Sequence, residues 1–510
     1  RFGVFCCDAL VMLRIVALSG NVVASLDCEE LSRLAASSDF LQAIKDYLEP
    51  LLNATTFQQR LLPVPSGTTD VLQVLVLPHR QDCAAELCSA AARGAQEDVR
   101  RLLEMPQDPN ACPPDGRSTP LLQAAVNGHL QVARNLVRAG ASLDAAAAAA
   151  QGNTPLVGAA AEGHLEVVRY LMAAGADKEK VNSSGAGPLR IAAGAGQIEV
   201  VRCLVEATVD LNQADVDGVT PLLAAAIRDN TEVMRCLIQA RSDLNRADLE
   251  GVTPLLAAVV RENREAARCL LDAGADKEKM DSTKLTPLLI AAARRDLDMV
   301  RCLLNARADT DWPRRQGVTP LYVAAARGYV EIVECLVGAR AEMNTKDTAD
   351  DATPLWAAAA RGQAEVVQYL VQAGADKDAA DGRSGSPLCV AAAEGHIQVM
   401  ELLMEARANV NHQANSARFT PLLTACAKGR TEVVRRLIRA GANKELADLS
   451  GVTPLWAAAS MGHAQIVESL IADGVSMDPG PPGLVAAANS HAEVVRLFED
   501  AGAMASLESR

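Results

Sequence analysis

Aromatic side chains are scarce in this chain. Phe, Trp and Tyr make up 3% of its 510 residues, although 49% of the residues are hydrophobic and alanine is abundant. This composition is expected where helices pack closely through small side chains. It favours a mainly α-helical protein.

Basic residues are too few to outnumber the acidic ones. The chain has 49 Lys and Arg residues against 63 Asp and Glu residues, which gives a formal net charge of −14 at pH 7. The sequence pI is about 5.1. General binding of nucleic acids requires a basic face, so we expect no nucleic-acid partner.

Long apolar runs and catalytic motifs are missing as well. No run approaches the roughly 18 apolar residues of a membrane-spanning helix. The sequence contains no P-loop, no H-E-x-x-H and no paired-cysteine zinc motif. We therefore expect no membrane span, no catalytic residues, no cofactor and no metal site, and an enzyme is not predicted.

What the sequence does contain is a repeat. Thr220-Pro221-Leu222 is followed 33 residues later by Thr253-Pro254-Leu255. A fixed period of about 20 to 50 residues indicates a stacked array of structural units. The opening residues of the units are spaced by 33 to 35 residues, and they are Thr119, Thr154, Gly187, Thr220, Thr253, Thr286, Thr319, Thr353, Ser386, Thr420 and Thr453.

Each copy carries the pattern of two helices. A Thr N-cap with Pro at the first helical position is a favoured helix start, and the Ala-Ala pairs that follow allow close packing. The second helix has Val and Leu at spacings of three to four residues, which buries one stripe. Neither helix can bury its faces alone, so the stability must come from interfaces between neighbouring copies.

The repeat resembles the ankyrin repeat. The copy from Asn153 to Lys178 shows the pattern most fully, with Thr154-Pro155-Leu156, Ala159-Ala160, Gly163-His164, Val167-Val168 and Ala174-Gly175-Ala176-Asp177. The resemblance implies an ankyrin solenoid of about 13 helix-turn-helix repeats over residues 81–510, with caps at about 81–114 and 479–510. It also implies a scaffold that binds other proteins on its concave face. We expect an intracellular protein, in the cytoplasm, with the nucleus as the alternative.

The first 80 residues lack the repeat. We expect residues 1–11 to be a leader or a gene-model artefact, because the chain begins at Arg1 and Met12 is a candidate start. Alternating residues then predict strands and a periodic apolar pattern predicts a helix. The expected elements are strands at Met12–Leu18 and Val22–Leu26, a helix within Glu29–Leu52, and strands at Phe57–Leu62 and Val71–Leu77.

This order resembles the small α+β ubiquitin-like β-grasp fold, over residues 12–80. Gln58–Leu62 and Leu72–Leu77 are similar to two strands of ubiquitin. The end is Pro78-His79-Arg80 rather than a diglycine, so conjugation to other proteins is not expected. Leu62 and Leu75 match positions of ubiquitin's exposed recognition patch, or they are ordinary residues of the sheet.

The array departs from the ankyrin pattern at two kinds of position. The usual His after T-P-L is replaced by Leu122, Val157, Arg190, Leu223, Leu256, Leu289, Tyr322, Trp356, Cys389, Leu423 and Trp456. Four arginines stand where the family has a left-handed Gly: Arg241, Arg307, Arg340 and Arg407. A non-Gly residue there costs about 1 kcal/mol, so either the backbone adjusts or stability is given up for surface charge.

The 13 cysteines do not form a disulfide or metal framework. Cys203, Cys236, Cys269, Cys302 and Cys335 occupy one position in five consecutive second helices. Stacked helices lie about 8–10 Å apart, whereas a disulfide needs Cα atoms within about 7 Å. We expect these cysteines to pack between repeats in a reducing compartment. The recurring loop histidines (His129, His164, His396, His463 and His491) are expected to be structural.

One row of charges stands out. The residue eight positions after the opening Thr is Arg228, Arg261, Arg294, Arg327 and Arg361 in five consecutive copies; these residues are called the arginine row below. In the ankyrin fold this position ends the first helix and faces the concave side. The row is either an anchor for acidic or phosphorylated segments or a solvated row that pairs with nearby carboxylates, inherited by duplication.

Hairpin tips are expected to add specificity, through Asp217, Glu250, Arg314, Arg315, Asp350 and Arg383. The sequence thus predicts a non-enzymatic interaction scaffold. The alternative is a substrate-selecting adaptor of the ubiquitin–proteasome system, in which the N-terminal domain docks on the degradation machinery. The sequence identifies neither the partner nor the oligomeric state.

Overall fold

The computed structural model describes residues 13–16, 22–26, 59–62, 73–76, 82–104, 108–113, 118–146, 151–312, 318–347, 351–382, 385–413, 418–476 and 491–501. The chain forms two compact units, Arg1–Leu249 and Glu250–Arg510. They are called the first and second unit.

The first unit begins with four short strands. β1 (Leu13–Val16) pairs antiparallel with β2 (Val22–Leu26), and β3 (Gln59–Leu62) pairs antiparallel with β4 (Gln73–Val76). Among the described residues these pairs make two separate two-stranded sheets. All four strands lie inside the predicted strand ranges, whereas the predicted helix within Glu29–Leu52 lies outside the described residues. The β-grasp assignment therefore stays a prediction.

Five helix pairs complete the described part of the first unit. Their bounds are α3 Asp82–Arg93, α4 Gln96–Leu103, α5 Pro120–Val126, α6 Leu130–Arg138, α7 Pro155–Glu162, α8 Leu165–Ala173, α9 Pro188–Ala195, α10 Ile198–Glu206, α11 Pro221–Ile227 and α12 Thr231–Gln239. Each pair is one copy of the sequence repeat, so helix and repeat boundaries agree.

The second unit continues the same pattern with seven described pairs and one further helix. Their bounds are α13 Pro254–Val260, α14 Arg264–Asp272, α15 Pro287–Ala293, α16 Leu297–Asn305, α17 Pro320–Arg327, α18 Val330–Gly338, α19 Pro354–Ala360, α20 Ala364–Gln372, α21 Pro387–Glu394, α22 Ile397–Glu405, α23 Pro421–Ala427, α24 Thr431–Arg439, α25 Pro454–Ser460, α26 Ala464–Ala472 and α28 Ala492–Asp500. The described residues thus confirm a mainly helical solenoid of 25 helices.

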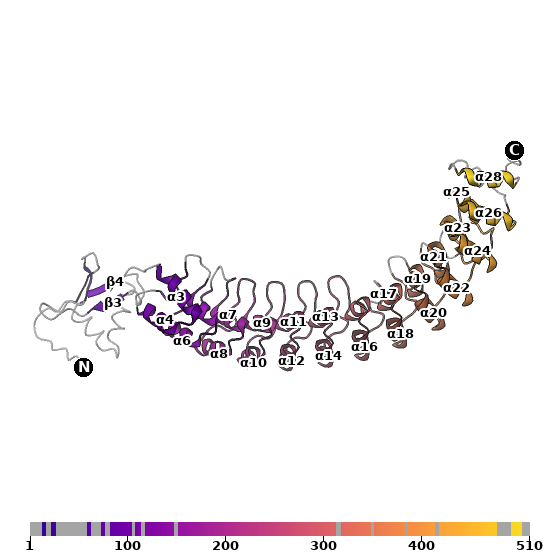
Figure 1. Ribbon diagram of the computed structural model, residues 1–510. Coiled ribbons are helices and arrows are strands. Elements are labelled where there is room, and N and C mark those ends of the chain that lie inside the picture. Colours follow the sequence, from indigo (N-terminus) through magenta and orange to yellow (C-terminus); the bar gives the residue numbers. More distant parts are fainter. Residues whose placement is uncertain are drawn as a thin grey trace, which may run out of the picture. The chain divides into compact units, whose positions relative to one another are not determined.

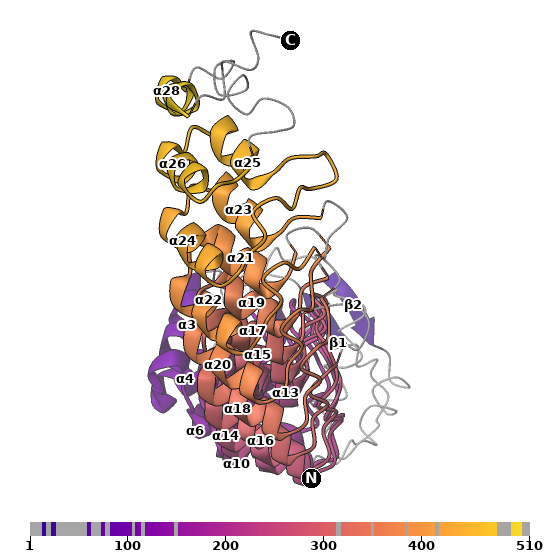
Figure 2. The same ribbon diagram turned by 90° about the vertical axis from the view of Figure 1, so that its right-hand side faces the viewer.

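Within each unit the helices form two layers (Figures 1 and 2). The odd-numbered helices, called inner helices, contact one another along one layer, and the even-numbered outer helices form the second layer. In the second unit the stack curves, and Figure 1 shows the inner helices on the inside of that curve. This side of the second unit is called its inner face.

The N-terminus of an inner helix shows why the T-P-L opening recurs. Thr220 is the N-cap of α11, and its hydroxyl oxygen accepts a hydrogen bond from the backbone N–H of Leu223 at 3.2 Å. Pro221 follows, where a missing N–H leaves no unsatisfied donor. The predicted cap is confirmed, and Leu223 itself is fully buried where the family has His.

Side chains of one repeat also bind the backbone of the next. In the first unit the Glu179 carboxylate accepts from the N–H of Asp210 at 2.8 Å, and the Asn212 side chain from the N–H of Asp243 at 2.8 Å. The second unit repeats this with Glu278 and Asp309 at 2.9 Å. These bonds satisfy loop N–H groups and fix the register of neighbouring repeats.

The loop histidines are structural, as predicted. The Nε2 atom of His164 lies 2.9 Å from the carbonyl of Val126 in the preceding repeat, and that of His463 lies 3.3 Å from the carbonyl of Ala427. A carbonyl only accepts, so each imidazole donates. His129, His396 and His491 make the same contact.

The four arginines at the left-handed position do not make the backbone adjust. Arg241, Arg307, Arg340 and Arg407 have φ angles of 65°, 60°, 69° and 61°. Gly441 holds the equivalent position with φ 86°. All four arginine side chains are exposed, so these positions carry surface charge at the expense of stability.

Replacing Arg307, Arg340 or Arg407 with Gly should stabilise the second unit. We expect each change to raise the free energy of unfolding by up to about 1 kcal/mol, because removing Cβ relieves the left-handed strain while Gly adds some entropy to the unfolded chain. The midpoint of urea unfolding measures it. Gly441→Arg is the matched control. An added Cβ meets nothing within 4 Å there, so no steric clash adds to the left-handed strain, and that strain should lower the midpoint. Unchanged midpoints in all four variants would contradict the strain.

Candidate protein-binding surface

The arginine row lies where the sequence predicted it, at the ends of inner helices. In the first unit Arg228 is the C-cap of α11. In the second unit Arg261, Arg294 and Arg361 are the C-caps of α13, α15 and α19, and Arg327 is the last residue of α17. All five side chains are exposed. A cation at a helix C-terminus is favoured by the helix dipole, so the position costs the fold little.

The guanidinium groups of the row have few hydrogen-bond or ion-pair partners within the protein. Arg294 Nη1 lies 3.7 Å from Glu262 Oε1, between side chains that are 44% and 58% exposed, a pair worth less than about 1 kcal/mol. Arg327 Nη1 donates to the carbonyl of Ala293 at 2.9 Å. The guanidinium groups of Arg228, Arg261 and Arg361 form no polar contact with any residue that the structure describes.

Four of the five arginines form a continuous series in the second unit. The inner helices α13, α15, α17 and α19 contact one another in sequence order, so neighbouring arginines are about 10 Å apart. That distance is close to the Debye length in physiological salt, so their mutual repulsion is modest. The series is an accessible strip of positive charge on the inner face of an acidic chain.

A second arginine series runs along the outer helices, and the sequence analysis missed it. It comprises Arg134, Arg169, Arg202 and Arg235 in the first unit and Arg268 and Arg301 in the second, each immediately before the cysteine position of its repeat. These guanidinium groups have partners. Arg134 lies over the Tyr170 ring at 5.6 Å, and Arg202 pairs with Glu199 at 3.4 Å. The signal in the sequence is an Arg followed two residues later by Leu in successive outer helices, as in Val201-Arg202-Cys203-Leu204.

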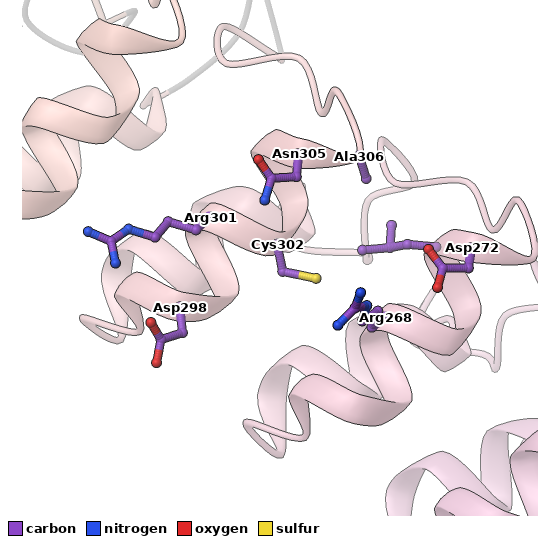
Figure 3. A pocket seen from close by; sticks show the side chains of 8 residues that line it. Arg268, Asp272, Asp298, Arg301, Cys302, Asn305 and Ala306 are labelled. Atoms are coloured by element: carbon purple, nitrogen blue, oxygen red, sulfur yellow. The ribbon is translucent and has the colours of Figure 1, made fainter.

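The cysteine series packs against these arginines. Arg169 lies beside the thiol of Cys203, and Arg202 beside that of Cys236. In the second unit Cys302 lines a pocket of about 470 Å³ between α14 and α16. Figure 3 shows its sulfur directed toward Arg268, while the guanidinium of Arg301 points the other way, and Arg301 lies beside Cys335.

Burial disfavours the reactive thiolate form of three cysteines in this series. The nine cysteines with described side chains are all free. Burial raises the pKa of Cys203, Cys236 and Cys302 above the ordinary value, although nearby Arg169, Arg202 and Arg268 oppose the shift. Thiolate nucleophiles need a lowered pKa, so these three thiols are not activated as nucleophiles. Among the described residues no group of three or more His, Cys, Asp or Glu could hold a metal ion.

Two of the predicted hairpin tips are described. Asp217 in the first unit and Glu250 in the second are exposed. The backbone carbonyl of Asp217 accepts from the N–H of Leu249 at 3.0 Å, and that of Glu250 from Ser282 at 2.8 Å. Hairpin neighbours are thereby tied together. Arg314, Arg315, Asp350 and Arg383 lie outside the described residues.

Apolar neighbours of these tips, which were not predicted from the sequence, are exposed as well. Val216 and Leu249 in the first unit are 63% and 77% exposed, and Leu449 in the second unit is 64% exposed. They follow Asp215, Asp248 and Asp448 in the recurring A-D-x sequence, which would have indicated them. Such residues give the hairpin edge an apolar contact surface beside its charges.

Deprotonation of a buried thiol should lower the stability of the second unit at high pH. Burial raises the pKa of Cys389 from 9.0 to about 11. Between these values the unfolded chain releases the thiol proton while the folded chain keeps it, so stability falls as pH rises. Urea midpoints at pH 8 to 11 measure this, with Cys389→Ala as the comparison. Parallel pH profiles of the two proteins would contradict the shift.

In the part of the chain that the structure describes, no helix has the length and hydrophobicity to cross a bilayer. No curated protein matches the chain. Many solved structures do. One is the crystal structure of the human ASB11 ankyrin repeat domain, with 24% identity and a TM-score of 0.40 over 44% of this chain and 98% of that one. This TM-score is too low for the likeness to support an argument.

The family comparison is more decisive. The model "Ankyrin repeats (3 copies)" matches residues 87–182, 189–281, 274–347, 339–414 and 388–481. These ranges contain the helix pairs, the Thr caps and the loop histidines already described. They cover well over half of the sequence, and the chain belongs to the ankyrin-repeat family.

Proposed function

We propose that this chain is a scaffold that binds acidic or phosphorylated segments of partner proteins, with the arginine row as its anchor. Ankyrin repeats bind other proteins, and their fold is typically a non-enzymatic interaction module. The finer assignment, to the inner face and to this ligand chemistry, is our inference from the residues.

One observation carries the proposal. The row is exposed at the ends of inner helices. Within the row, Arg294 alone has a carboxylate partner among the described residues, at 3.7 Å. The alternative of a solvated row that pairs with nearby carboxylates accounts for that residue alone. The outer arginines show the contrast, since Arg202 pairs with Glu199 and Arg134 covers Tyr170.

The chemistry of guanidinium groups fits such a ligand. Arg keeps its charge at all physiological pH values and offers a planar set of donors that matches the two oxygens of a carboxylate or phosphate. Several weak exposed contacts in series can hold a partner that no single one would hold. The hairpin tips Asp217 and Glu250, with Arg314, Arg315, Asp350 and Arg383, are proposed to add specificity. An intracellular location fits the free thiols.

The adaptor of the ubiquitin–proteasome system remains the alternative. It rests on the sequence of residues 12–80, in which the described strands β1 to β4 form two antiparallel pairs. Among the described residues β1 contacts β4, but no hydrogen-bonded strand pairing joins the two pairs into one sheet. The scaffold is therefore preferred, and the alternative predicts a partner set that depends on residues 1–80.

Reversing the charge of the row should remove specific partners. Full-length chain and the variant with Arg261, Arg294, Arg327 and Arg361 changed to Glu are used to capture proteins from cell extract. Circular dichroism checks that both are folded. We expect the variant to lose acidic partners at least tenfold, because attraction becomes repulsion at four contacts.

A matched control separates position from net charge. Changing Arg241, Arg307, Arg340 and Arg407 to Glu alters the formal charge equally but leaves the inner row intact, and it should keep the partners. If both variants retain the same partners, the row is a product of repeat duplication. A third bait without residues 1–80 tests the adaptor alternative. If that alternative holds, proteasome components are captured by the full-length chain and lost selectively from this bait.

A further inference from the structure

A pocket of about 450 Å³ opens on the inner helices of the second unit. It is lined by residues of α21, α23 and the end of α25. Val390 and Leu423 are buried there, and Phe419, just before the cap of α23, is half-buried. The lining is therefore largely apolar at its interior.

The rim of this pocket continues the arginine row. Glu394, Lys428 and Met461 line the pocket and hold the same repeat position as Arg361, in the next three repeats. Met461 is 59% exposed. The helices α17, α19, α21, α23 and α25 contact one another in order, so the strip of arginines leads to the pocket within one continuous stack.

We propose that this pocket takes one large apolar side chain of an extended acidic peptide, whose carboxylates continue along Arg361, Arg327 and Arg294. This inference rests on the proposed function and names the ligand of the same surface. The complementarity is of two kinds. Apolar area of the anchor is buried against Val390, Phe419 and Leu423, and negative charge meets guanidinium groups that have few partners within the protein.

The repeat spacing sets the spacing of the peptide. Neighbouring inner helices are about 10 Å apart, and an extended chain advances about 3.3 Å per residue. One acidic residue at every third position therefore faces successive arginines. Glu394 repels acid at the rim, so the first carboxylate belongs at Arg361, about four or five residues from the anchor.

Synthetic peptides test the proposal on the full-length chain. The probe is a fluorescein-labelled Ser/Gly peptide with Glu at every third position and one Phe placed four residues before the first Glu, made also in the reverse order. Its partner peptide has Ala in place of Phe. Fluorescence anisotropy gives the two dissociation constants. We expect the Phe peptide to bind at least about tenfold more tightly, because a buried aromatic side chain adds that much affinity.

Two variants localise the effect. Ala427→Phe fills the pocket from the end of α23, and Met461→Glu makes its rim acidic. Either change should abolish the advantage of the Phe peptide while leaving the Ala peptide unaffected or slightly weakened. Ala161→Phe, the equivalent position of α7 in the first unit, is the control and should preserve the advantage.

The outcomes separate this inference from the proposed function. Equal binding of the two peptides to the unaltered chain overturns the pocket and leaves the arginine row standing. Tighter binding of the Phe peptide that survives reversal of the row arginines supports the pocket and contradicts the acidic-ligand function. Absence of binding by both peptides contradicts both proposals for this ligand chemistry.

Discussion

The interface between neighbouring repeats is the constraint on which the rest of the structure depends. Inner helices bury Ala pairs such as Ala225-Ala226, and outer helices bury Val and Leu stripes such as Val233 and Leu237. Each buried face belongs to two repeats at once, so no helix pair is stable by itself. Bonds such as Glu278 to the N–H of Asp309, at 2.9 Å, then fix the register that apolar packing leaves open.

This constraint decides where function can reside. Residues along the helices are committed to packing, as the buried Leu223 and Leu256 show where the family has a polar residue. Residues at the helix ends and hairpin tips are not needed for this packing. The same repeat position can therefore hold Arg327, Glu394 or Met461 without disturbing the stack. The surface that recognises a partner varies while the scaffold stays constant.

Much of this arrangement could be predicted from the sequence. The period located the helix pairs from α5–α6 to α25–α26, and the Thr-Pro pair located the start of inner helices such as α11. The left-handed arginines, including Arg407, were placed correctly because the Gly they replace is needed for its backbone conformation, with φ 61° at Arg407. Helix caps and left-handed backbone positions depend on residues within one repeat, so they recur wherever the sequence pattern recurs.

Other features could not be found in this way. The pocket beside Leu423 and Met461 forms from three repeats together, and a single copy of the pattern does not contain it. Some partners of the outer arginines are also in neighbouring repeats, as with Arg169 beside Cys203. A row of arginines at one position of successive helices therefore looks the same in the sequence in both cases. Its charges are either paired with groups of a neighbouring repeat or exposed to a ligand.

Chemical modification of arginine tests the central claim most directly. Phenylglyoxal labelling followed by mass spectrometry compares the chain alone with the chain bound to the acidic peptide. We predict that Arg294, Arg327 and Arg361 become protected while the exposed Arg307, Arg340 and Arg407 of the same unit react as before. Equal labelling of the row in both states, or protection of the second set instead, would contradict binding at the inner face.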